Sequence, residues 1–183
     1  MLFDLLIKNG KIMDGTGNPW FLGGVAIKGS KIEKIGSING SLAPEVIDAK
    51  GFVVAPGFVD IHSHADFVLP IDEHPKILEP FVRQGITTIV TGNCGYSPAP
   101  INPETLELFK TYTSFLQATE LQWEWLDMKE YMDFIEKRGV AYNVVPLVSH
   151  GAIRIAVKGF DSGPATDSEK KEMAKLAREA MEH

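Results

Sequence analysis

The sequence has a single cysteine and no long apolar run. Cys94 is the only cysteine among 183 residues, which excludes a disulfide within the chain and agrees with a reducing compartment. No window approaches the roughly 20 uninterrupted apolar residues of a membrane span, and the first residues lack the basic and apolar regions of a secretion signal. We therefore expect a cytoplasmic protein without a membrane partner.

Clusters of positive charge are also missing. Lysine and arginine together number 18, against 24 aspartates and glutamates, which gives a formal net charge of -6 at pH 7. Proteins that bind nucleic acid or anionic membranes concentrate basic residues in one stretch, so neither is an expected partner here. The sequence also contains no internal repeat and no low-complexity tract.

Residues 1–56 have the pattern of short strands joined by tight turns. Strands are predicted at 3–8, 24–28, 31–35 and 52–55, with turns at Asn9-Gly10 and Gly29-Ser30. This pattern predicts a small all-β module.

From Gly57 onward, strands alternate with helices. A strand is followed by a helix-like stretch at 75–84, a β-branched strand at 86–90, a helix at 128–138 that Gly139 ends, and a buried strand at 140–148. Such alternation is typical of a parallel α/β sheet, here with the start of three βα units.

The remaining segments are a long excursion and a final helix. Residues 97–125 are irregular apart from a helical stretch at 104–115, and Trp123 and Trp125 are expected to pack this excursion onto the sheet. A capping box at Thr166 begins the final helix, whose apolar stripe is expected to face the core. Because this helix has no stop signal and a complete (β/α)8 barrel needs about 250 residues, we expect a piece of a longer chain.

Two histidines follow the first strand of the second region. Successive strand side chains point to opposite faces, so His62 and His64 would share one face and could hold one metal ion between them. Cys94 lies just past the second strand, where a thiolate is a strong zinc ligand. Most lone cysteines are small buried hydrophobes, but Gly92 and Gly95 would let the backbone turn sharply, which favours a ligand.

Four segments in this order carry a family resemblance. The chain resembles the amidohydrolase superfamily, and within it the N-acyl-D-amino-acid deacylase (D-aminoacylase) family, in DLLIKNG with DGTG (4–10 and 14–17), PGFVDIHSH (56–64), TGNCG (91–95) and SHGAIR (149–154). The resemblance implies an α/β fold in which 57–183 form a partial TIM barrel of three to four βα units. A small β-sandwich segment at 1–56 would precede it.

The resemblance also implies an activity. The family's enzymes are zinc-dependent and hydrolyse the amide bond of N-acyl-D-amino acids through a metal-activated hydroxide. His62, His64 and Cys94 would be metal ligands for one or two zinc ions, and a small acyl-amino compound would be the substrate. The family places two more histidine ligands and a catalytic aspartate on later strands, so no catalytic residue is expected within residues 1–183. This chain alone is expected to be inactive, and its open sheet edge should make it self-associate.

Four further polar residues lie near these strand ends. His150 is expected to contact substrate or to support a ligand from behind, although a cap or core role stays open. Arg154 would either orient a substrate carboxylate or tether its own loop. Asp66 would orient a histidine ligand or face water. Asp60, which shares the strand face of His62, would contact substrate or support a ligand from behind.

Two alternatives to the deacylase interpretation stay open. A cyclic-amide hydrolase of the dihydroorotase or hydantoinase kind would bridge two metals with a modified lysine and would have no need of Cys94. A non-catalytic relative would keep the barrel for assembly alone, which the joint presence of His62, His64 and Cys94 argues against.

Overall fold

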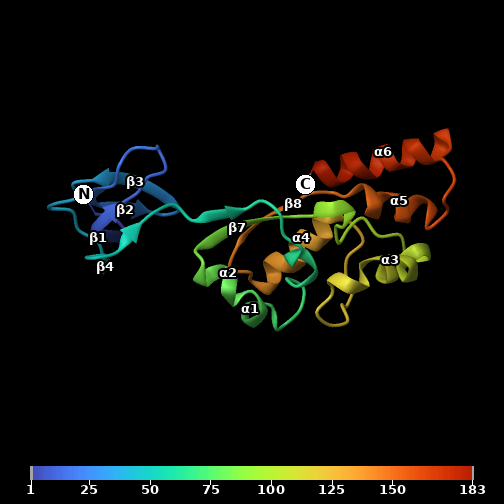
Figure 1. Cartoon of the computed structure of the whole chain (residues 1–183), viewed down its shortest axis with the longest axis horizontal. Coiled ribbons are helices and arrows are strands. Elements are labelled where there is room, and N and C mark those ends of the chain that lie inside the picture. Colours follow the sequence, from blue (N-terminus) through green and yellow to red (C-terminus); the bar gives the residue numbers. More distant parts are fainter. Residues whose placement is uncertain (1, 183) are drawn as a thin grey trace. The chain divides into compact units, whose positions relative to one another are not determined.

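The computed structural model describes residues 2–182 (Figure 1). The chain forms two compact units, Met1–Pro56 and Gly57–His183, and the division falls where the sequence pattern changes. Among the described residues, no helix combines the length and the apolar composition needed to cross a membrane.

The first unit is one five-stranded sheet. Its strands are β1 (Leu5–Ile12), β2 (Phe21–Lys28), β3 (Lys31–Gly36), β4 (Glu45–Asp48) and β5 (Val53–Val54). The order is β3-β2-β1-β4, with β5 paired to β1, and β4 and β5 run parallel to β1 whereas β2 is antiparallel. Its buried core is Phe3, Leu6, Ala26 and Ile38. Because residues 2–56 form a single sheet, the β-sandwich stays a prediction.

The turn predicted at Asn9-Gly10 is wrong. Strand β1 continues through both residues, and Asn9 adopts a φ of 62° where the pairing register with β2 shifts. Asparagine tolerates this left-handed conformation better than most residues, so the pair forms a bulge within one strand. The sequence prediction also missed β4, whose four residues are all exposed and show no apolar alternation.

The second unit is built on a three-stranded parallel sheet. Strands β6 (Phe58–Asp60), β7 (Ile86–Thr91) and β8 (Asn143–Pro146) lie side by side in that order. Parallel neighbours joined by helical connections confirm the α/β expectation.

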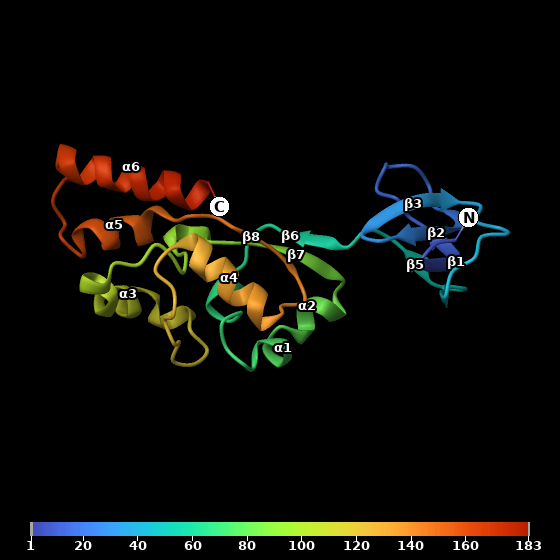
Figure 2. The ribbon, with the colours of Figure 1, turned by 180° about the vertical axis from the view of Figure 1, so that it is seen from behind.

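Helices α1 (His74–Ile77), α2 (Glu79–Arg83) and α4 (Met128–Arg138) lie on one side of this sheet (Figures 1 and 2). The single helix predicted at 75–84 is broken at Leu78, because Pro80 has no N–H to donate to the preceding turn. Helix α4 has the predicted bounds and ends at Gly139, whose φ of 80° lets its N–H bond two carbonyls of the last turn. The core between helices and sheet includes Leu78, Ile89, Tyr131 and Ile135.

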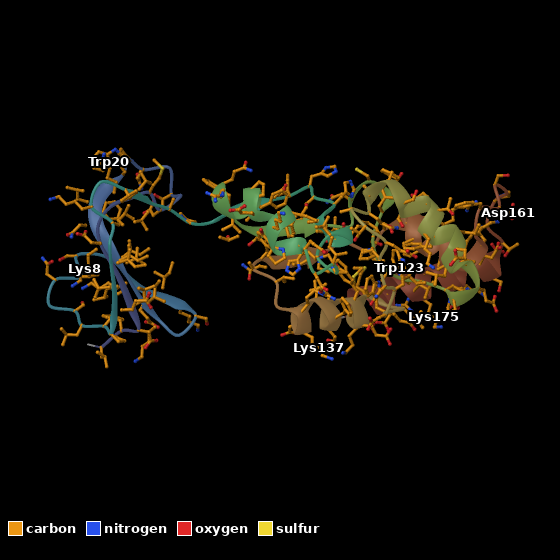
Figure 3. All side chains as sticks on the ribbon, turned by 90° about the horizontal axis from the view of Figure 1, so that it is seen from below. Lys8, Trp20, Trp123, Lys137, Asp161 and Lys175 are labelled. Carbon is orange, nitrogen blue, oxygen red and sulfur yellow. The ribbon has the colours of Figure 1, made fainter. Side chains whose placement is uncertain are left out.

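The excursion between β7 and α4 contains helix α3 (Leu106–Thr113). Trp125 is 1% exposed, and its Nε1 donates a hydrogen bond to the carbonyl oxygen of Pro98 at 2.9 Å. Trp123, labelled in Figure 3, packs against the same core. The packing role expected for both tryptophans is confirmed.

Helices α5 (His150–Lys158) and α6 (Asp167–Met181) lie side by side in both ribbon views (Figures 1 and 2). The capping box at Thr166 is confirmed, since Thr166 and Glu169 bond each other's backbone N–H. The core-facing stripe of α6 is confirmed in part. Met173, Leu176, Ala177 and Ala180 are half-buried, and Ala180 packs against the core, whereas Met181 is 78% exposed. Helix α6 packs against α5, and Met181 is its last residue, which leaves that side chain uncovered.

The buried strand predicted at 140–148 is also wrong in part. Strand β8 covers Asn143–Pro146 only, and Val145 and Leu147 are each 45% exposed. Within residues 2–182, β8 pairs with β7 alone and no helix covers the face that carries Val145. Parallel sheets are usually covered on both faces, so this surface is unusually apolar.

Gly92, just after β7, is a position where no side chain fits. A Cβ on Gly92 would lie 1.9 Å from the carbonyl oxygen of Leu147, whereas a Cβ on Gly139 would meet nothing within 4 Å. Both glycines have a φ near +80°, so alanine costs about 1 kcal/mol of backbone strain at either position. We expect Gly92→Ala to lower the free energy of unfolding by at least about 2 kcal/mol more than Gly139→Ala. Urea denaturation followed by circular dichroism measures the difference, and equal midpoints would contradict it.

Candidate metal centre

Strands β6 and β7 are parallel neighbours, so the segments that follow them emerge at one edge of the sheet. Strand β6 ends at Asp60 and β7 at Thr91, and the N–H of Ser63 donates to the carbonyl of Val90 at 3.0 Å. This bond continues the pairing past the end of β6. It brings the segment with both histidines against the turn that carries Cys94.

The two histidines lie in an irregular segment and not on the strand, so the strand alternation that predicted a shared face is wrong. Strand β6 stops at Asp60, whose carboxylate Oδ1 accepts a hydrogen bond from the backbone N–H of His62 at 3.1 Å. This bond holds the chain in a bend that turns it out of the strand. The rings of His62 and His64 still meet, edge to face, with centroids 5.7 Å apart.

Cys94 lies in a strained turn. A 3₁₀ turn covers Asn93–Gly95, and within it Cys94 has a φ of 56°, a left-handed conformation that costs a non-glycine residue of order 1 kcal/mol. Gly92 enters the turn with a φ of 79°. The side chain of Asn93 donates to the carbonyls of Val90 at 3.0 Å and Ser63 at 3.4 Å. The thiol is exposed at the surface of the unit.

The three predicted ligands converge. His62 Nε2 lies 3.0 Å from Cys94 Sγ, and one ligand atom from each of His62, His64 and Cys94 lies within 4.8 Å of the others. A tetrahedral zinc ion, with Zn–N about 2.0 Å and Zn–S about 2.3 Å, separates such atoms by roughly 3.5 Å. Two imidazole nitrogens and one sulfur are also a donor set that zinc prefers, so the residues fit this metal.

His64 is in the state that a metal ligand needs. Burial, and secondly the neighbouring His62 ring, lowers the pKa of the His64 imidazole, which favours the neutral form. Its Nδ1 is buried and has no hydrogen-bond partner among the described residues. The ring of Tyr96 packs edge-on against it, with centroids 6.0 Å apart.

Asp66 neither bonds a histidine nor faces water, the two roles considered for it. It is fully buried, and its Oδ2 accepts a hydrogen bond at 2.9 Å from the backbone N–H of Gly92, at the start of the cysteine turn. Tyr131 donates to its backbone carbonyl at 3.0 Å. Burial raises the pKa of the Asp66 carboxyl to about 7. The hydrogen bond from Gly92 lowers this pKa, but by less than burial raises it.

His150 and Arg154 lie on α5, after β8. His150 is exposed at the first position of the helix, and Ser149 caps that helix by accepting the N–H of Ala152. The next residue, Gly151, approaches the cysteine turn so closely that a Cβ there would lie 2.3 Å from the carbonyl oxygen of Gly95. The first turn of α5 therefore lies beside the converged ligands.

Arg154 tethers its own loop, the second of the two roles considered for it. Its Nη2 donates to the carbonyls of Asp161 at 2.7 Å and Gly163 at 3.0 Å, in the connection between α5 and α6. Figure 3 labels Asp161 in this connection. A substrate role for Arg154 stays a prediction.

Sequence reasoning missed two residues of this region, Asn93 and Tyr96. Asn93 ties the two ligand segments together, and Tyr96 packs on His64. Both lie within two residues of Cys94, which is the signal that could have found them: the neighbours of a ligand in a tight turn share its surroundings.

Comparisons with known proteins agree on one family. A model of the amidohydrolase family matches residues 45–183. An N-acyl-D-aspartate deacylase of Alcaligenes xylosoxydans xylosoxydans is 38% identical over 183 residues, covering 98% of this chain and 34% of that protein.

Two solved structures are similar as well. An N-acyl-D-glutamate deacylase from Bordetella bronchiseptica, complexed with zinc and a phosphonate inhibitor, is 32% identical with a TM-score of 0.82, over 100% of this chain and 37% of that one. A D-aminoacylase with a binuclear metal centre is 32% identical with a TM-score of 0.81, over 98% and 36%. The chain spans about a third of the length of these relatives.

The buried Asp66 carboxyl makes a pH-dependent contribution to stability. With a pKa raised from 3.8 to about 7, it is protonated in the folded state at pH values where the unfolded chain has lost the proton. Its contribution is therefore most favourable below about pH 4, falls as the pH rises to about 7, and is constant above. Asp66→Asn keeps an acceptor for Gly92 and does not titrate. We expect the stability of this variant relative to wild type to rise between pH 4 and 7, by up to about 1.4 kcal/mol per pH unit. Urea denaturation with chelator present measures it, and parallel stability curves would rule out the raised pKa.

Proposed function

Because this chain belongs to the amidohydrolase family, we propose that it carries metal ligands of a zinc-dependent hydrolase that cleaves the amide bond of N-acyl-D-amino acids. One observation carries the proposal: the ligand atoms of His62, His64 and Cys94 lie within 4.8 Å of one another, beyond two adjacent parallel strands. The similarity to N-acyl-D-amino-acid deacylases over nearly the whole chain supports the substrate class.

The proposed fold is the beginning of a (β/α)8 barrel. Strands β6, β7 and β8 would be its first three strands, with β1–β5 belonging to a β-sandwich. In such barrels the active site lies at the carboxyl ends of the strands, which is where the three ligands emerge. Within residues 2–182 neither β6 nor β8 has a second neighbour, which supports self-association of this chain on its own.

The proposed cofactor is one or two zinc ions. When bound, zinc supplies a nucleophilic hydroxide near neutral pH and polarises the scissile carbonyl. His64 would offer a neutral imidazole to the metal, and Cys94 would offer a thiolate. The ligand atoms of His62 and Cys94 already lie close together. Asp60 would hold the bend at His62, and Asp66 would hold the entry to the cysteine turn.

We propose that His150 contacts the substrate. We propose no residue of this chain for the proton-transfer steps. His150 is exposed beside the cysteine turn and could donate to a substrate oxygen. None of the described acidic residues is proposed as the general acid or base, so the chain alone should not turn over substrate.

Metal titration tests the proposed ligands directly. Cobalt(II) reports the geometry of zinc sites, and a thiolate ligand adds a charge-transfer absorption. We expect the wild-type chain to show this band, and Cys94→Ser and His62→Asn to lower the affinity at least about tenfold. His74→Asn is the matched control, since His74 is buried, bonds the carbonyl of Ile71 and is not one of the ligands. An unchanged cobalt affinity in Cys94→Ser would contradict the proposed metal site.

A hydrolysis assay tests the substrate class. N-acetyl-D-amino acids and their L enantiomers would be supplied to this chain and to any longer protein of which it forms part. We expect turnover of the D enantiomers only, by the longer protein only, and its loss when a chelator is added. Activity that survives chelation, or hydrolysis of cyclic amides in preference to acyl-amino acids, would contradict the proposal.

A further inference from the structure

Asn93 connects the two ligand segments through one side-chain amide. Its Nδ2 donates to the carbonyl of Val90 at 3.0 Å and to the carbonyl of Ser63 at 3.4 Å. Ser63 lies between His62 and His64, and Asn93 itself precedes Cys94. The amide therefore joins the peptide between both histidines to the residue next to the cysteine.

The segments on either side of this amide have little regular structure of their own. His62 and His64 lie in a bend beyond β6, and Cys94 lies in a 3₁₀ turn with a φ of 56°. A left-handed cysteine persists only where its surroundings hold it, because relaxation would recover of order 1 kcal/mol. Hydrogen bonds from neighbouring groups are the means by which ligand side chains are kept in place.

Two other hydrogen bonds join these segments to the fold before the ligands are reached. The bond from Ser63 N–H to Val90 joins the histidine segment to β7, and the bond from Gly92 N–H to Asp66 fixes the entry of the turn. Beyond Gly92, the Asn93 amide is the next connection toward Cys94. Its two N–H groups suit two carbonyl acceptors, a task that no carboxylate or hydroxyl can perform alone.

We propose that Asn93 is a positioning residue that holds Cys94 in register with His62 and His64. This inference rests on the proposed metal site and assigns a cause to the 3.0 Å approach between Cys94 Sγ and His62 Nε2. Loss of the amide donors releases the cysteine turn, so the three ligand atoms no longer converge unless the metal itself reassembles them.

The test uses an isosteric variant. Asn93→Asp keeps the shape of the side chain but replaces the two donors with a carboxylate that faces two carbonyl oxygens. In a cobalt(II) titration of the 183-residue chain at fixed pH, we expect the affinity to fall about 10- to 100-fold, the usual effect of removing a hydrogen-bond partner behind a ligand. The thiolate-to-cobalt absorption should be weaker at saturation, because Cys94 binds in a smaller fraction of the complexes.

Asn102→Ala is the matched control. Asn102 is likewise half-buried in the second unit and bonds backbone at both ends of its amide, to the carbonyl of Ala156 and the N–H of Glu104. Removing it should lower the unfolding midpoint but leave the cobalt affinity and the thiolate absorption unchanged. Should Asn93→Asp fail to fold, Asn93→Ala removes the donors without adding charge and carries the same comparison.

The outcomes separate this inference from the proposed function. Wild-type chain that binds no cobalt through Cys94 would overturn the metal site and this inference with it. Wild-type binding with equal affinity and equal absorption in the Asn93 variants would overturn the positioning role and leave the metal site standing. Weaker binding and a reduced thiolate band in the Asn93 variants, with Asn102→Ala unchanged, would support both.

Discussion

The candidate site depends on the parallel pairing of β6 with β7. The two strands pair from Phe58 to Asp60, with a register shift after Phe58, and the bond from Ser63 to Val90 extends that pairing past the end of β6. Residues 32 positions apart thereby come within 3.0 Å, His62 on one segment and Cys94 on the other. The contact depends on the strands, because a bend and a 3₁₀ turn do not form the regular hydrogen bonds that would hold two segments together.

Two residues at the site lower the stability of the folded chain. Cys94 is held in a left-handed conformation, and Asp66 is a buried carboxyl whose pKa is raised to about 7. Such departures from local preference are expected where geometry serves a function and the rest of the fold supplies the compensation. Here the compensation comes from the core that α2 and α4 form against the sheet, together with Trp125 and its bond to Pro98.

Local signals in the sequence predicted the ends of two helices correctly. The bounds of α4 followed from its apolar spacing and from Gly139, and the start of α6 followed from its capping box at Thr166. Predictions failed where burial or strand pairing depends on segments distant in the sequence. The burial of β8, and of Met181 at the end of the α6 stripe, depends on which residues cover them. Strand β1 runs through Asn9-Gly10 because pairing with β2 outweighs the local turn preference.

For the site, the sequence alone determined which residues could bind a metal and near which strand ends they lie, since residue chemistry and the order of elements are local properties. The family resemblance, too, could be recognised in short motifs. Only the tertiary structure decided that Asp66 supports the cysteine turn, that Arg154 tethers its loop, and that Asn93 joins the ligand segments. These roles depend on which backbone groups meet across the sheet edge, and no spacing along the chain encodes such a meeting.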